Sequence, residues 1–223
     1  MKAGSLPRPA AAQVGRRRPR LFYLSLATAA LLLGLGIWQL GGAATIHAKA
    51  WLAQILLERA WSRTLAQQTG GAEVSAQQRP WPWADTFPAA RLQVPDLAID
   101  QIVLSGASGR TLAFGPAHLD GTAAPGAAGH SVLSGHRDTH FRFLEQLAAG
   151  QAIRLQRPDG TWQSYEVTDS RVIDAREARL RLGDGSPALT LVTCYPFDAV
   201  TPGGPLRYLV FAEEAGSTLA TAR

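Results

Sequence analysis

Residues 21–40 form a run of twenty positions without a charged side chain. A helix rises about 1.5 Å per residue, so this run spans roughly 30 Å, the thickness of the hydrocarbon core of a bilayer. The pattern therefore predicts a transmembrane helix at 21–40.

A second helical pattern follows directly. Apolar residues recur at spacings of three and four within 44–68, and the pair Gly70-Gly71 comes next. This periodicity predicts an amphipathic helix that ends at the glycines. The stripe has two interpretations: it packs on the domain that follows, or it lies on the membrane with Trp51 and Trp61 at the surface. Its members are Ile46, Ala50, Ala53, Leu57, Trp61 and Leu65.

From Arg91 the pattern changes to short β-prone runs separated by Gly, Pro and Asp. A segment at 77–88, with Pro80-Trp81-Pro82-Trp83, predicts an extended strap that leads into them. A short helix is expected at 141–147. Many short strands with few helices indicate a closed or nearly closed β-barrel. The predicted strands are 91–94, 97–104, 130–134, 152–156, 162–174, 189–193 and 207–212.

The charges predict an orientation in the membrane. Arg16, Arg17, Arg18 and Arg20 stand before the apolar run, and no acidic residue precedes Glu58. The positive-inside rule places the N-terminus in the cytoplasm and everything after the anchor outside. A cleaved signal peptide is the alternative, since Ala48-Lys49-Ala50 offers a cleavage site, but its apolar core usually has about 7–15 residues. We expect a cytoplasmic tail at 1–20, a single-pass anchor in the cytoplasmic membrane at 21–40, a juxtamembrane helix at 44–70, and an extracytoplasmic (periplasmic) domain at 77–215.

The formal charge of +5 does not indicate a nucleic-acid partner. Seven of the 22 Lys and Arg residues precede Glu58, which leaves 15 basic and 17 acidic residues in the rest of the chain. The globular part is therefore slightly acidic, and no nucleic-acid binding is predicted.

Cys194 is the one cysteine, and it ends the apolar run Leu189-Thr190-Leu191-Val192-Thr193. A lone thiol in an exported protein is inert, pairs between chains, or reacts. Pro196 stops the strand, so Cys194 lies at a strand end. A thiol becomes a nucleophile as thiolate, with help from a neighbouring imidazole or guanidinium.

Two cationic side chains are candidates for that help. His136 follows a predicted strand, and Gly135 lets the backbone bend so that the ring projects into a cleft. Arg207 opens the last strand, where a guanidinium can favour a thiolate and hold a developing oxyanion. His140 is a rival for His136. A zinc site on His136 and His140 is disfavoured, because strand ends do not hold the i,i+4 spacing of a helix face.

The order of these residues resembles the sortase family. The matching phrases are Ser134-Gly135-His136-Arg137-Asp138-Thr139, Leu191-Val192-Thr193-Cys194 and Arg207-Tyr208-Leu209-Val210, preceded by Gly115-Pro116-Ala117-His118. The resemblance covers about Trp81 to Glu213. Cys194-Tyr195-Pro196-Phe197 and the Pro-Trp-Pro-Trp strap look similar to the Gram-negative-type (class GN) sortases.

The resemblance implies an eight-stranded sortase barrel and a cysteine transpeptidase. By this resemblance, Cys194 would attack the carbonyl after Thr in an LPxTG-like C-terminal sorting signal of a substrate protein, Arg207 would stabilise the oxyanion or position the signal, and His136 would protonate the leaving glycine amine. Thr193 is an expected substrate-binding neighbour. The resemblance implies no metal and no organic cofactor, and it does not identify the acceptor amine. Asp138 and Asp198 are candidates to orient His136, but the family does not depend on a third acid.

Three alternatives remain. In papain-like peptidases the cysteine precedes the histidine and begins a helix. In L,D-transpeptidases the two lie close together, whereas here they stand at 136 and 194. A catalytically silent membrane-anchored binding module predicts an unreactive Cys194.

Overall fold

The structure is a computed structural model, and it describes residues 18–69, 77–177, 187–201 and 203–216. The chain divides into two compact units, Met1–Lys49 and Ala50–Arg223. Each unit is described by itself.

One long helix, α1 (Arg18–Thr69), covers the segments in which the sequence predicts two helices. In the first unit, Phe22–Gly42 is long and apolar enough to cross a membrane, with a mean hydropathy of 1.6. Its described side chains are exposed in the first unit, as lipid-facing side chains are. By length and composition, this helix is consistent with a membrane anchor.

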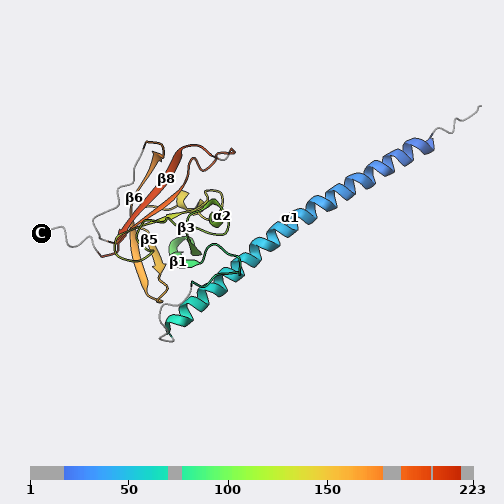
Figure 1. The fold of residues 1–223 in the computed structure, drawn as a ribbon. Coiled ribbons are helices and arrows are strands. Elements are labelled where there is room, and N and C mark those ends of the chain that lie inside the picture. The colour runs from blue at the N-terminus through green and yellow to red at the C-terminus, as the bar shows by residue number, and fades with distance from the viewer. Residues whose placement is uncertain (1–17, 70–76, 178–186, 202, 217–223) are drawn as a thin grey trace, which may run out of the picture. The chain divides into compact units, whose positions relative to one another are not determined.

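The second unit contains a closed barrel of eight strands in the order β1-β2-β3-β4-β7-β8-β6-β5 (Figure 1). The pairs β2–β3 and β4–β7 are parallel, and the other pairs are antiparallel. The strands are β1 (Pro88–Val94), β2 (Ile99–Ser105), β3 (Ala117–His118), β4 (His130–Ser134), β5 (Ala152–Gln156), β6 (Trp162–Asp174), β7 (Ala188–Cys194) and β8 (Leu206–Glu214). The predicted eight-stranded barrel is confirmed.

Short helices connect the strands: η1 (Pro95–Leu97), α2 (Gly109–Leu112) and η2 (Arg142–Glu145). The predicted helix at 141–147 is the shorter η2. The strand β3 was not predicted, because two residues are too few to show an alternation of apolar and polar positions.

Strand alternation separates the barrel interior from its outer wall. Along β7, Leu189 and Leu191 belong to the buried core, together with Leu133 of β4 and Val210 of β8. Successive side chains of a strand point to opposite faces. Even-numbered residues of β4 and β7 and odd-numbered residues of β8 therefore lie on the outer wall.

The part of α1 in the second unit packs on the barrel. Leu57 and Trp61 form a buried cluster with Ile102, Leu104 and Ala117. Of the two interpretations of the apolar stripe, the structure therefore supports packing on the domain. Trp61 is 1% exposed, so its predicted position at the membrane surface is wrong, whereas Trp51 is 68% exposed.

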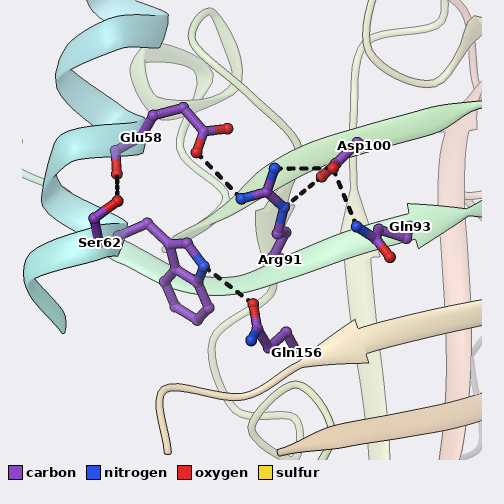
Figure 2. A network of polar contacts seen from close by, with 7 residues as sticks. Glu58, Ser62, Arg91, Gln93, Asp100 and Gln156 are labelled. Atoms are coloured by element: carbon purple, nitrogen blue, oxygen red, sulfur yellow. Dashed lines mark hydrogen bonds and ion pairs between the residues drawn. The ribbon is translucent and has the colours of Figure 1, made fainter. Parts of the chain in front are cut away.

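Polar contacts also join the helix to the barrel (Figure 2). Glu58 pairs with Arg91 at 3.2 Å, and Arg91 also donates to Asp100 at 2.6 Å. The indole Nε1 of Trp61 donates to Oε1 of Gln156 at 3.4 Å. These contacts fix which face of the helix meets β1 and β5.

We expect Trp61→Ala to lower the free energy of unfolding by about 3–5 kcal/mol, because it leaves a cavity between helix and barrel. The measurement is denaturant unfolding of the detergent-solubilised protein. Trp51→Ala is the matched control and should change stability by less than about 0.5 kcal/mol. Equal stabilities of the two variants would contradict the docking of the helix.

Candidate active site

Cys194 is the last residue of β7, and its thiol is free and partly exposed. The apolar run before it forms the strand because β-branched and apolar side chains fill the barrel core on one face. Cys194 is an even-numbered residue of β7, so it lies on the outer wall near one end of the barrel.

Arg207 is the direct cross-strand partner of Cys194 in the antiparallel pair β7–β8. The next pair along, Tyr195 and Leu206, is linked by a hydrogen bond from N to O of 3.1 Å. Hydrogen-bonded and non-hydrogen-bonded pairs alternate in such a ladder, and side chains of the second kind are closer. Cys194 and Arg207 therefore form a close, non-hydrogen-bonded pair on one face of the wall.

The guanidinium of Arg207 is held by the loop that connects the two strands. Its Nη1 donates to the carbonyl oxygens of Gly204 and Leu206, each at 2.8 Å. These two bonds hold Nη1 of Arg207 at the backbone that precedes it.

His136 and Cys194 follow the same end of the parallel pair β4–β7. Ser134 pairs with Val192, the last pair of this ladder, and N of Gly135 donates to O of Val192 at 3.1 Å. His136 comes two residues after Ser134, and Cys194 comes two residues after Val192, so we expect the two to lie near each other. His136 is exposed. The fold thus brings all three predicted residues, Cys194, His136 and Arg207, to one place.

Thr193, predicted to contact substrate, lies on the core side of β7 and is 2% exposed. Its Oγ1 donates to the carbonyl oxygen of Gly135 at 2.7 Å. In this structure the side chain supports the backbone that precedes His136.

Gly135 is required for a reason other than the predicted bend. Its φ is not positive. Instead, a Cβ at this position would lie 2.6 Å from the ring of Phe141, which is fully buried in the barrel core. The ring occupies the space that a side chain would need.

The rival His140 has a different environment from His136. Burial lowers the pKa of His140, and the charge of His136 lowers it further. A neutral, partly buried imidazole is a poor proton donor. This environment favours His136 as the residue that gives up a proton.

Arg137 was not singled out from the sequence. It is a charged side chain that is only 5% exposed, and it pairs with Asp138 at 2.9 Å. The hydrogen bond from Arg137 lowers the pKa of Asp138. The carboxylate of Asp138 is therefore ion-paired with Arg137. No signal in the sequence distinguishes a buried arginine of this kind from an exposed one.

The arrangement suits acyl transfer through a thioester. Cys194 pairs with Arg207 of β8, and β4 on the other side of β7 leads into His136. A guanidinium and an imidazole are groups that can generate a thiolate and stabilise an oxyanion. Among the described residues, no group of three or more His, Cys, Asp or Glu side chains could hold a metal ion.

Comparison with known proteins identifies the family. Residues 92–215 match the sortase domain. This match covers more than half of the chain, and the chain therefore belongs to the sortase family.

The individual proteins to which the chain is similar are also sortases. Sortase D of Bacillus subtilis (strain 168) is 31% identical over 123 residues, 55% of this chain and 61% of that protein. The chain thus spans about three fifths of this curated relative's length. The crystal structure of sortase C-1 from Actinomyces oris is 29% identical, with a TM-score of 0.51, and covers 69% of this chain and 97% of that one. Sortase C of Clostridium perfringens, solved with the C-terminal cell wall sorting motif, has the same fold at 24% identity and a TM-score of 0.51, over 71% of this chain and 87% of that one. Membership of class GN stays a prediction.

We expect Gly135→Ala to destabilise the barrel by about 1–3 kcal/mol, because the added methyl group overpacks against Phe141. The measurement is the shift of the melting temperature. Gly109→Ala is the control, since a Cβ there meets nothing within 4 Å. A Gly135→Ala variant as stable as the control would show that the core yields to the methyl group at no cost.

Proposed function

We propose that the protein is a membrane-anchored transpeptidase that cleaves a sorting signal and transfers the cleaved protein to an amine. The observation that carries this proposal is that β7 ends at Cys194, opposite Arg207 of β8, while its other neighbour, β4, leads into His136. Membership of the sortase family supports the same reaction class.

In the first half-reaction the thiolate of Cys194 attacks the carbonyl carbon of Thr in an LPxTG-like signal. A C–S bond forms and the Thr–Gly C–N bond breaks. The imidazolium of His136 gives its proton to the departing amine. The product is a thioester between Cys194 and the substrate protein.

In the second half-reaction an acceptor amine attacks the thioester. The neutral His136 takes the proton from the amine, a C–N bond forms, and the C–S bond breaks. The thiolate–imidazolium pair is thereby restored, so no oxidant or cofactor enters the balance.

Arg207 stabilises the oxyanion of both tetrahedral intermediates. Its Nη1 is held by Gly204 and Leu206, while Nε and Nη2 make no hydrogen bond to the described part of the chain. These remaining N–H groups are free for an oxygen of the substrate.

The sorting signal as substrate is supported by the Clostridium perfringens relative, which was solved with such a motif. The anchor is supported by the apolar segment Phe22–Gly42 and by the arginines that precede it. With the N-terminus in the cytoplasm, the catalytic domain lies outside the cytoplasmic membrane, where sorting signals of exported proteins are accessible.

The test is to incubate the protein with a peptide that contains Leu-Pro-x-Thr-Gly and to measure the intact mass. We expect an adduct on Cys194 that contains the peptide up to Thr, released by a small amine as the transfer product. Cys194→Ala should form no adduct and no product while it keeps the melting temperature of the parent. Continued cleavage by Cys194→Ala would contradict the nucleophile assignment, and an adduct that ends at another residue would contradict the signal.

A central role of His136 predicts that His136→Ala lowers kcat/KM by about 10²–10⁴-fold, the usual contribution of general acid–base catalysis. His140→Ala is the matched control, because His140 is already neutral and partly buried. Its rate should stay within about tenfold of the parent. The reverse ranking of the two variants would assign proton transfer to His140.

A further inference from the structure

Arg137 directly follows His136, and its charged side chain is 5% exposed. Burial of a charge costs several kcal/mol unless hydrogen bonds replace its water. The hydrogen-bond partners of this guanidinium therefore indicate the role of the buried arginine.

Those partners lie just after the proposed nucleophile. Nη1 of Arg137 donates to the carbonyl oxygen of Pro196 at 2.6 Å, and Nη2 donates to that of Ala199 at 2.9 Å. Nearby, Nη1 of Arg142 donates to the carbonyl oxygen of Phe197 at 2.8 Å. Two arginines of the segment after β4 thus bind three backbone carbonyls of the β7–β8 loop, those of Pro196, Phe197 and Ala199.

These bonds begin where the sheet ends. The β4–β7 ladder extends as far as the bond between Gly135 and Val192. Beyond it, His136 and Cys194 have no sheet hydrogen bonds with each other among the described residues. Beyond the ladder, the forked guanidinium of Arg137 connects the two segments, because it contacts Pro196 and Ala199 at the same time.

Ion pairing keeps Arg137 in this position. Nε donates to Oδ1 of Asp138 at 2.9 Å, so the three nitrogens of the guanidinium each have an oxygen partner. The hydrogen bond to Asp138 is also the largest cause of the raised pKa of Arg137. The guanidinium of Arg137 therefore faces the loop that follows Cys194.

We propose that Arg137 is a positioning residue that fastens the β7–β8 loop to the histidine segment and so holds the imidazole of His136 beside Sγ of Cys194. Its guanidinium binds backbone carbonyls and does not touch substrate. This inference rests on the proposed acyl transfer.

The test variant is Arg137→Lys in the full chain. It keeps the charge, but one ammonium cannot reproduce the planar fork that reaches Pro196, Ala199 and Asp138 together. Since a displacement of about 1 Å costs about 10²-fold, we expect kcat for transfer of the sorting-signal peptide to fall about 10- to 100-fold. KM should change by less than about threefold, because the substrate makes no contact with Arg137.

Arg110→Gln is the control, since Arg110 is 81% exposed in its pair with Asp85 and lies outside the site. It should retain the parent kcat. A parent-like kcat in Arg137→Lys would overturn the inference, and so would a loss confined to KM, which would make Arg137 a substrate-binding residue. Absence of transfer in the parent protein would instead refute the proposed function.

A second variant keeps the inference testable if Arg137→Lys does not fold. Arg142 is half exposed, so Arg142→Gln should leave the fold intact while it removes the bond to Phe197. We expect a smaller fall in kcat, about 3- to 10-fold, again with little change in KM. We also expect faster amide hydrogen exchange in residues 197–201. An unchanged kcat together with unchanged exchange would overturn the proposed role of the loop attachment.

Discussion

The parallel pairing of β4 with β7 is the constraint on which the site depends. Ser134 pairs with Val192 at the end of this ladder, and His136 and Cys194 each follow two residues later. The antiparallel pairing of β7 with β8 then adds Arg207 on the same face. Leu133, Leu191 and Val210 fill the core from the opposite face of these strands. A slip of one residue would turn the thiol into the core, so burial of these apolar side chains also fixes the chemistry.

Further contacts join the segments that follow the ends of β4 and β7. On the core side, Thr193 bonds to the carbonyl of Gly135, and the ring of Phe141 fills the space beside Gly135. On the loop side, Arg137 and Arg142 bind the backbone after Cys194. The reacting side chains are thus partly or fully exposed, whereas Thr193, Phe141 and Arg137, which support the backbone around them, are buried.

The sequence was sufficient for elements whose signal is local. The strands at 130–134, 152–156 and 162–174 have the predicted bounds, because their turns and β-prone runs are sharply delimited. The three site residues were predicted from their order along the chain. Contacts between distant segments were harder to predict: the sequence left open whether the stripe with Trp61 packs on the domain, and it did not indicate that Arg137 is buried against a loop some sixty positions away. An apolar stripe does not show what it packs on, and one arginine in a sequence looks like any other.

The proposed site requires that position 136 lie beside Cys194. Because Cys194 is the one cysteine, His136→Cys gives a direct measurement: the mass and the number of alkylatable thiols after mild oxidation. Neighbouring strands are about 4.8 Å apart, within the range of about 4.4–6.8 Å that a disulfide spans between Cα atoms. We predict a mass lower by two hydrogens and no free thiol, whereas the control Ser170→Cys, on β6, keeps both thiols. Two free thiols in oxidised His136→Cys would contradict this arrangement of the site.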